Sequence, residues 1–319
     1  MNMQKKILTL TLSGVLVALS VEQSALARGG SSSGKVWTYL KSYNSTNYDT
    51  NTGKPKKLAS GCTVPDGIMD KVLRLLPEGN ALAIDSPLFT EDTQANILLK
   101  KDANIKVAFV GEGAGYTNAL GFFSFDKTKL TSLTSSSIVE KIVFPNFSAK
   151  NSGGDLSLGD TVDLGTIAAG KGVGFTVVSN GWQSNQVRSD RTDNQIFRTV
   201  KNLNPEPSSQ KLNYHTVLLS DPESKVLVIS IEDLNRQSSS YNDNGYVSDN
   251  DFNDAILAIC VDPFDAIEGV DTLINIDTGT EGTSPTETDP TPDGTDGTEK
   301  IKGAGGRQSW SERTVPSSM

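Results

Sequence analysis

A short acidic segment, Ser-Asp-Asn-Asp-Phe-Asn-Asp at residues 248–254, carries the side chains best suited to chemistry in this chain. Asp249, Asp251 and Asn253 alternate along it, so they lie on one side of an extended segment or fold inward in a tight loop. Asp254 adds a fourth oxygen-bearing group. Calcium takes about six to eight hard oxygen ligands, many of them carboxylates and amides. The segment therefore predicts a Ca²⁺ site.

The segment is not an EF-hand loop, although its D-x-D-x-N spacing begins like one. The sixth position is Asp254 instead of glycine, and Cys260 stands where the loop needs its glutamate. No helical pattern flanks the segment on either side. The alternative to a metal site is a solvated turn, because Asn and Asp favour turns in any case.

Two further carboxylates follow the preceding apolar run. Residues 226–231 read as a strand that ends in Glu232 and Asp233, and residues 255–261 read as the next strand. If these strands are antiparallel, the end of the first and the start of the second lie at one edge of the sheet. Carboxylates crowded there repel one another unless a cation balances them. We therefore expect these metal ligands: Asp233, Asp249, Asp251, Asn253, Asp254 and Glu232.

Other chemistries have little support in the residues. The single histidine, His215, begins an apolar strand, which favours a structural hydrogen bond over catalysis. A zinc site normally needs several His and Cys. The glycine-rich stretch 111–115 lacks the G-x-G-x-x-G spacing of nucleotide binding. The one catalytic alternative is a hydrolase with Glu112 as acid and an Asp as base or nucleophile, which requires a carboxyl kept protonated by burial.

The ends of the chain indicate export. Residues 1–27 combine Lys5 and Lys6, an apolar run and the small residues of a cleavage site, as in a signal peptide. We expect a protein outside the cell or at its surface, with the periplasm as an alternative, and no membrane span after the signal is removed. In such a compartment Cys62 and Cys260 should form a disulfide. The net charge of −9 over 319 residues argues against nucleic acid as a partner.

Short strand-like runs separated by Gly, Asn, Asp and Ser turns predict an all-β fold, a single β-sandwich or jelly-roll-like domain. One short amphipathic helix is expected between Pro65 and Pro77. The expected regions are a signal peptide at 1–27, an extended lead-in at 28–60, the β domain at 61–265, and an acidic tail at 266–319. The tail should be largely disordered, because it is rich in Thr, Pro, Gly and Asp and has few core-forming side chains.

Four stretches resemble one known family, in the family's order along the chain. They are residues 76–78, 107–121, 174–181, and 232–234 with 248–254. Together they are similar to the LruC-type secreted bacterial domain, catalogued as domain of unknown function 4114, over about residues 66–261. The resemblance implies an envelope or extracellular protein with a β-rich fold and no settled activity. Its acidic positions, for which metal binding and catalysis are both conceivable, match Glu112, Glu232, Asp233, Asp249, Asp251, Asn253 and Asp254.

The function that these patterns favour is a calcium-binding module that acts in adhesion, in a matrix, or in binding a surface glycan or protein. Trp182, Tyr116 and Tyr246 lie in loops beside the motifs and could stack on sugar rings. The alternatives are the carboxylate-dependent hydrolase that uses Glu112, and a purely structural secreted domain. We expect an unidentified extracellular protein or glycan as the partner.

Overall fold

The computed structural model describes residues 35, 37–40, 47–89 and 96–279. The predicted signal peptide and residues 280–319 of the predicted tail lie outside this part of the chain. The strands are β1 (Thr38–Tyr39), β2 (Ile97–Leu98), β3 (Ala103–Gly111), β4 (Ala119–Asp126), β5 (Lys141–Phe144), β6 (Thr161–Ile167), β7 (Lys171–Val178), β8 (Trp182–Gln183), β9 (Gln186–Val187), β10 (Ile196–Arg198), β11 (Thr216–Asp221), β12 (Val226–Ile231), β13 (Ala255–Asp262) and β14 (Ile274–Asn275). Helix α1 is Ile68–Leu75, and short 3₁₀ helices lie at Lys127–Ser132, Asp193–Gln195, Lys201–Leu203, Ser209–Lys211, Ser239–Tyr241, Asp243–Gly245, Phe264–Ala266 and Val270–Thr272.

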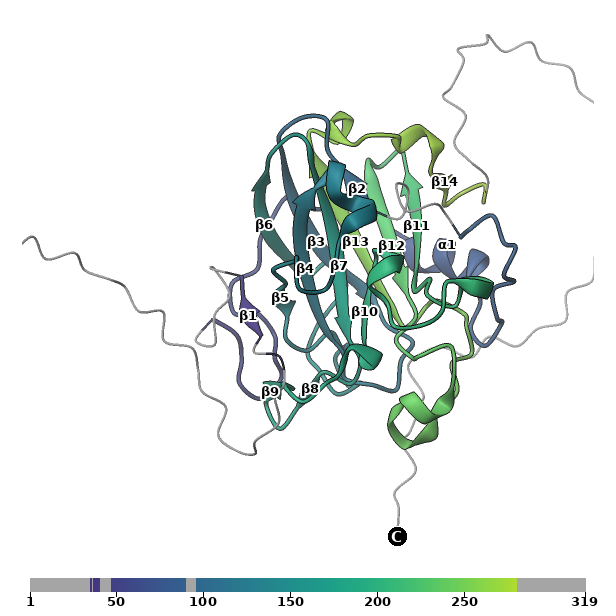
Figure 1. The fold of residues 1–319 in the computed structure, drawn as a ribbon. Helices are drawn as coiled ribbons and strands as arrows, with labels where there is room; N and C mark the ends of the chain where they lie inside the picture. Colours follow the sequence, from purple (N-terminus) through teal and green to yellow (C-terminus); the bar gives the residue numbers. More distant parts are fainter. Residues whose placement is uncertain (1–34, 36, 41–46, 90–95, 280–319) are drawn as a thin grey trace, which may run out of the picture. The chain divides into compact units, whose positions relative to one another are not determined.

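The strands form two six-stranded sheets and a small β8–β9 hairpin, which confirms the predicted all-β fold. Sheet I has the order β1-β5-β4-β7-β10, with β2 paired to β7, and sheet II has the order β14-β11-β12-β13-β3-β6. The two sheets lie face to face as a β-sandwich (Figure 1). The strands predicted at 226–231 and 255–261 are present as β12 and β13, and α1 forms within the predicted helical segment.

The core between the sheets comes from the two-residue period of the strands. Ile105, Val107 and Phe109 of β3 point into one cluster with Phe122 of β4 and Phe175 of β7, and all five are buried. The intervening residues of sheet II point the other way, where they are covered in turn. Strands that are buried on both faces read as nearly continuous apolar runs, which is why the sequence located them well.

Helix α1 covers part of the outer face of sheet II. Ile68 and Val72, four residues apart, share one side of the helix and pack in a second cluster with Val110 of β3 and Ile256 of β13. The cluster continues into Leu76, just after the helix, which is 1% exposed. This packing fixes the chain that follows α1 at the end of sheet II where β12 ends and β13 begins.

The sandwich includes chain on both sides of the predicted limits of 61 and 265. Strand β1 pairs with β5 in parallel, and β14 pairs with β11 in parallel. Leu273 and Ile276 are buried beside β14. A brief apolar run within a polar stretch is therefore enough to add an edge strand, although the surrounding composition predicted a tail.

Cys62 and Cys260 form the predicted disulfide, with their Cα atoms 5.5 Å apart. The bond connects the chain before α1 to strand β13. Within residues 35, 37–40, 47–89 and 96–279, no helix has the length and apolar character that a membrane span requires.

Candidate metal centre

The pairing of β12 with β13 brings the predicted acidic residues together. The two strands are antiparallel, with Ile231 opposite Ala255. Glu232 and Asp233 leave the end of β12 at the point where Asp254 enters β13, and the Asp233 N–H donates to Asp254 Oδ2 at 3.0 Å. The expectation that these strand ends meet at one edge is confirmed by this register.

The acidic loop, residues 248–254, is tightly turned and not extended. Asn250 and Phe252 have positive φ angles of 61° and 62°, a region that a bulky residue such as phenylalanine seldom adopts. Phe252 is held there because its ring is completely buried and packs edge-on against Phe89, 5.1 Å away between ring centres. The turned backbone carries the side chains of Asp251 and Asn253 inward.

Arg236 fixes the loop from outside. Its Nε donates to Asn250 Oδ1 at 2.7 Å, and its guanidinium lies 4.8 Å from the ring centre of Phe252. The same group donates to the backbone carbonyls of Lys211 at 2.9 Å and Tyr214 at 2.7 Å. The loop is thereby bound to the rest of the domain through a half-buried guanidinium that donates to oxygen acceptors from both sides.

Two groups of three carboxylates meet in this region. In the first group, one oxygen each from Glu232, Asp251 and Asp254 lies within 4.8 Å of the others. In the second group, the same holds for Glu78, Asp249 and Asp251. Calcium–oxygen distances are about 2.3–2.6 Å, so oxygens with this mutual spacing can contact one ion. Asp251 belongs to both groups.

The two other predicted ligands lie next to these groups. Asp233 is 2% exposed, and its Oδ2 accepts a hydrogen bond from Asn118 Nδ2 at 2.5 Å. Asn253 is 1% exposed, and its Nδ2 donates to the Leu76 carbonyl at 3.2 Å. The Asp233 carboxylate is therefore held beside the cluster by its hydrogen bond to Asn118. The hydrogen bond of Asn253 to Leu76 directs its amide oxygen away from Leu76.

Burial makes the negative charge of the first group unfavourable. Loss of water, followed by the charges of Asp233 and Asp249, raises the pKa of Glu232 to about 8. Burial is also the main cause that raises the pKa of Asp233 to about 6 and that of Asp254 well above its usual range. Glu232 is completely buried, and its Oε2 has no hydrogen-bond partner among the described residues. Among the described residues, no hydrogen-bond donor or cationic side chain contacts Glu232 Oε2.

Glu112 is a member of neither carboxylate group. It is 9% exposed at the end of β3, and its Oε1 accepts a hydrogen bond from the Ala149 N–H at 3.4 Å. Burial raises the pKa of Glu112 to about 7, against the hydrogen bonds from Ser152 and Ala149, which lower it. A protonated carboxyl near neutral pH is what the hydrolase alternative requires, but no Asp of the two groups is joined to Glu112 in a carboxylate pair.

His215 has the structural role favoured by its position. It is 1% exposed, its Nδ1 lies 2.9 Å from the Glu232 carbonyl oxygen, and its Nε2 lies 2.9 Å from Glu206 Oε1. Its ring stacks on Phe197 at a centroid distance of 4.0 Å. With His215 occupied and both cysteines in a disulfide, the site offers only oxygen ligands, which suit hard cations such as Ca²⁺.

The sequence reasoning missed Glu78 as a site residue. The chain after α1 reaches the acidic loop through two backbone hydrogen bonds, from the Gly79 N–H to Asp251 Oδ2 at 2.8 Å and from the Leu82 N–H to the Asn250 carbonyl at 2.8 Å. The only available signal was Leu-Pro-Glu at residues 76–78, which resembled the family's lead-in. It gave no reason to place Glu78 beside residues so distant along the chain.

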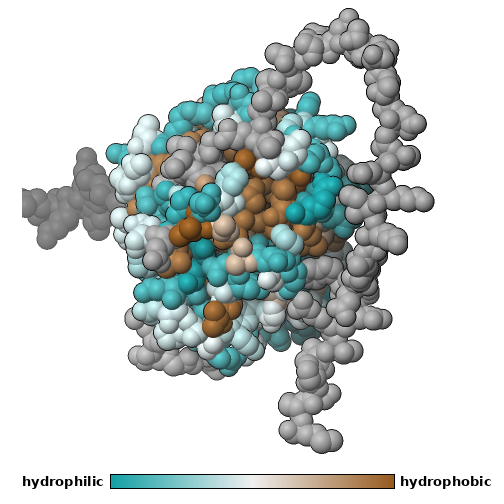
Figure 2. Space-filling view, turned by 90° about the vertical axis from the view of Figure 1, so that its right-hand side faces the viewer, coloured by the Kyte–Doolittle hydropathy of each residue, from teal (hydrophilic) through white to brown (hydrophobic). Residues whose placement is uncertain are grey.

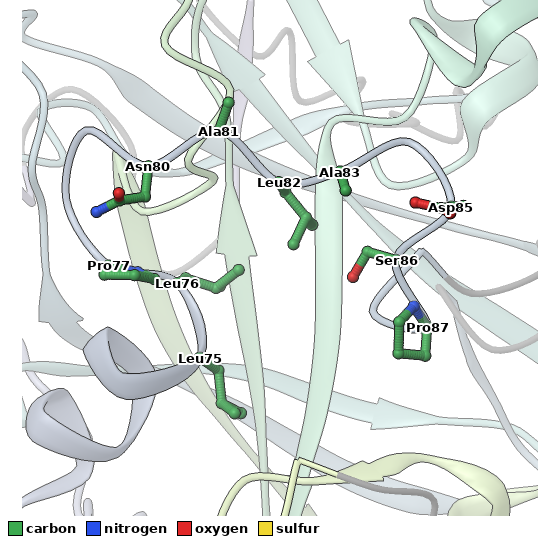
Figure 3. Close-up of a pocket in the computed structure, with 10 residues that line it drawn as sticks. All are labelled: Leu75, Leu76, Pro77, Asn80, Ala81, Leu82, Ala83, Asp85, Ser86 and Pro87. Carbon is green, nitrogen blue, oxygen red and sulfur yellow. The ribbon is translucent and has the colours of Figure 1, made fainter.

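The same segment, from Leu75 to Pro87, lines an open pocket of about 530 Å³ (Figure 3). Its lining is mostly apolar: Leu75, Leu76, Pro77, Asn80, Ala81, Leu82, Ala83, Asp85, Ser86 and Pro87. Apolar side chains also gather at the surface on the side of the molecule that carries α1 in Figure 1, as Figure 2 shows. Glu78 and Gly79 lie along the chain between the lining residues Pro77 and Asn80, but neither they nor Glu112 line the pocket.

Residues 167–262 match the family model of DUF4114, a domain of unknown function. The matched stretch includes β7 to β13, Glu232, Asp233 and the whole acidic loop. This confirms the resemblance to the domain of unknown function 4114, whereas the LruC-type designation is not part of the match. Glu78 and Glu112 lie outside the matched residues. No curated protein and no solved structure matches the chain significantly.

Proposed function

We propose that this chain, with its DUF4114 segment, is an exported β-sandwich module that binds calcium at the acidic loop and acts in adhesion or in the binding of an extracellular protein or glycan. One observation carries the metal proposal. Glu232 Oε2 is buried without a hydrogen-bond partner, in a residue grouped with Asp251 and Asp254. A buried carboxylate oxygen that has no partner is unfavourable, and a cation at this place removes the penalty.

Calcium fits the ligands better than other cations. Carboxylate and amide oxygens are hard ligands, and the flexible coordination of Ca²⁺ accepts the uneven spacing of side chains from β12, β13 and the loop. Magnesium demands near-ideal octahedral geometry and gives up its waters reluctantly. The site should therefore prefer calcium over magnesium.

Two features support the extracellular binding role. The signal-like residues 1–27 and the disulfide between Cys62 and Cys260 fit an oxidising compartment. Next to the acidic loop, Tyr246 and Val247 are 55% and 75% exposed, so apolar contact surface lies beside the exposed carboxylate of Asp249. A glycan or protein surface that contacts Tyr246 would lie at the edge of the metal site.

Of the three aromatic residues expected to stack on sugars, only Tyr246 is available for that role. Trp182 is 5% exposed and packs edge-on against Tyr48. Tyr116 donates its hydroxyl proton to the Asp243 carbonyl at 2.8 Å and packs against Tyr246. The glycan-binding form of the proposal therefore depends on Tyr246.

Calcium should raise the melting temperature of the full chain, and chelator should lower it again. An ion that binds only the folded state stabilises it by about 2.7 kcal/mol when present at about a hundredfold excess over Kd. Asp251→Ala should abolish this response, and Asp251→Asn should weaken it. The measurement is thermal melting by circular dichroism, in calcium, in magnesium and in chelator.

The matched control is Glu223→Gln, which removes one carboxylate from the same sheet. Glu223 is exposed in the β11–β12 turn, at the opposite end of β12 from the site. This variant should respond to calcium like the unchanged chain. A melting curve that is insensitive to millimolar calcium and to chelator, with no bound metal by elemental analysis, would sink the proposal and leave the loop as a solvated turn.

The hydrolase alternative has one observation in its favour, the raised pKa of Glu112. A general acid normally contributes a factor of about a hundred or more to the rate. Glu112→Gln should then lower turnover by about that factor while the fold is retained. Unchanged turnover of an identified substrate would eliminate Glu112 as the acid.

The pKa of Glu112 also predicts a dependence of stability on pH, whatever the function. Between the ordinary pKa of 4.5 and the folded value of about 7, the folded state holds a proton that the unfolded state has lost. The free energy of unfolding therefore falls as pH rises through this interval and levels off above it. Relative to the unchanged chain, Glu112→Gln should gain on the order of 3 kcal/mol at pH 8 and nothing at pH 4. Urea unfolding at both pH values, with chelator present, measures the difference; equal gains at both would contradict it.

A further inference from the structure

We propose that the open pocket lined by ten residues from Leu75 to Pro87 is a peptide site. Its ligand is a segment of a partner protein in which apolar side chains are followed by a lysine or an arginine. Calcium at the acidic loop strengthens the binding of this segment. The peptide site follows from the lining of the pocket, whereas its dependence on calcium rests on the proposed function.

The pocket has the size and the apolar character of a ligand site. Its volume of about 530 Å³ falls within the range of about 300–1,000 Å³ that is typical of such sites. Leu76 and Leu82 lie between its two ends in Figure 3. Pro77, Ala83 and Pro87 are exposed and extend the apolar lining to the surface. An extended segment with apolar side chains can therefore lie along the pocket.

The polar groups at the two ends of the pocket suit a cation. Of the ten described residues that line it, Asp85 carries the one formal charge, and this residue is exposed. Asn80 donates from its Nδ2 to the Glu78 carbonyl at 3.1 Å, which leaves its amide oxygen as an acceptor. Asn80 and Asp85 lie at opposite ends of the pocket in Figure 3. An apolar segment that ends in an ammonium or guanidinium group complements this lining, because both groups are donors only.

The cations of the neighbouring helix α1 do not neutralise Asp85. Lys71 pairs with Asp221 at 3.3 Å and with Asp277 at 3.1 Å. Arg74 lies 4.0 Å from the same Asp277 carboxylate. Among the described residues, none forms an ion pair with Asp85. Its carboxylate is therefore available to a cation of the ligand.

The acidic loop holds the wall of the pocket through three hydrogen bonds. They are Asn253 Nδ2 to the Leu76 carbonyl at 3.2 Å, the Gly79 N–H to Asp251 Oδ2 at 2.8 Å, and the Leu82 N–H to the Asn250 carbonyl at 2.8 Å. Without a cation, the carboxylates around Asp251 repel one another and loosen the loop that makes these bonds. Calcium therefore orders the wall before the peptide arrives, and binding to an ordered site costs less entropy.

Peptide binding to the full chain tests the proposal. The probe is a dye-labelled peptide Ser-Leu-Ala-Leu-Lys-Ser, measured by fluorescence anisotropy beside two versions of it. One version has glutamate in place of lysine, and the other has serine in place of both leucines. In calcium, the lysine peptide should bind about fivefold more tightly than the glutamate peptide, and the serine version should not bind. Chelator should weaken the binding of the lysine peptide by about fivefold or more.

Substitutions at exposed positions test the lining. Ala83→Lys places a cation in the pocket and should weaken binding of the lysine peptide. The matched control is Ala168→Lys, between β6 and β7, which should bind like the unchanged chain. Asp85→Asn should reduce the difference in affinity between the lysine and glutamate peptides. Ala83, Asp85 and Ala168 are all exposed, so each variant should fold, and circular dichroism checks this.

The outcomes separate this proposal from the calcium site. The peptide site is overturned if the lysine peptide does not bind in calcium, if it binds no better than the glutamate peptide, or if Ala83→Lys and Ala168→Lys bind it equally. Equal affinity in calcium and in chelator, in a chain whose melting temperature rises with calcium, overturns the dependence on calcium and leaves the calcium site intact. A chain without bound calcium by elemental analysis overturns the calcium site and the dependence together.

Discussion

Replacing both Cys62 and Cys260 by alanine should lower the free energy of unfolding by about 4 to 5 kcal/mol. The disulfide joins residues separated by 198 positions, so without it the unfolded chain regains the freedom of a very long loop. In the chain-entropy account, the stabilisation grows with the logarithm of loop length. Urea unfolding of the oxidised chain and of the double variant, both in saturating calcium, measures the difference.

Reductant added to the unchanged chain is the control, and it should reproduce the effect of the double substitution. The calcium response should persist in both cases, because neither cysteine contributes to the carboxylate groups. If the double variant and the oxidised chain unfold at the same urea concentration with the same slope, the long-range bond adds nothing to stability and the prediction is wrong.

The acidic cluster shows how much of a site can be predicted from local patterns. Strands β12 and β13 are consecutive apolar runs, and their antiparallel pairing follows from their adjacency along the chain. That pairing alone brings Glu232 and Asp233 to Asp254, since Ile231 stands opposite Ala255. The sequence therefore predicted the members of the first carboxylate group without any knowledge of the other sheet.

The contributions from distant parts of the chain could not be predicted in the same way. Glu78 reaches Asp251 because Ile68 and Val72 anchor α1 on the outer face of sheet II, and this packing depends on the completed sheet. In the sequence, Arg236 has no feature that distinguishes it from other polar loop residues. In the structure it is half-buried and donates the hydrogen bond that holds Asn250. The spacing of apolar residues shows which side of a helix or strand faces the core. It does not show which loops contact one another in the folded chain.

Short edge strands were missed for a related reason. Strand β10 covers only Ile196–Arg198, too few residues for an alternating pattern to stand out from a loop. It is retained in sheet I by pairing with β7 and by the side chain of Arg198, which is completely enclosed. A buried arginine in so short a strand has no signal in the sequence, because arginine is normally exposed.

Arg198 takes part in the ion pair whose disruption should be among the most damaging changes to the fold. Its Nε donates to Glu140 Oε1 at 2.8 Å, and both side chains are completely buried. The same carboxylate oxygen accepts a hydrogen bond from the Thr176 hydroxyl at 2.7 Å, and Arg198 Nη1 donates to the Leu203 carbonyl at 3.0 Å. Glu140→Leu removes the anion and leaves the guanidinium buried without it. Loss of one partner of a buried pair costs about 3 to 5 kcal/mol, and we expect a loss in that range.

The double variant Glu140→Leu/Arg198→Met provides the control, because it replaces both fully buried charges with apolar side chains and leaves only their more exposed partners, Lys35 and Asp193. Replacing a whole buried pair in this way is often neutral, so the double variant should recover most of the lost stability. Both variants should bind as many calcium ions per chain as the unchanged protein. Arg198 is in sheet I and Glu140 directly precedes its strand β5, whereas the carboxylate groups lie at the ends of strands in sheet II. Urea unfolding in saturating calcium gives the two free energies. A double variant as unstable as Glu140→Leu would show that the hydrogen bonds to Thr176 and Leu203, and not the unpaired charge, account for the loss.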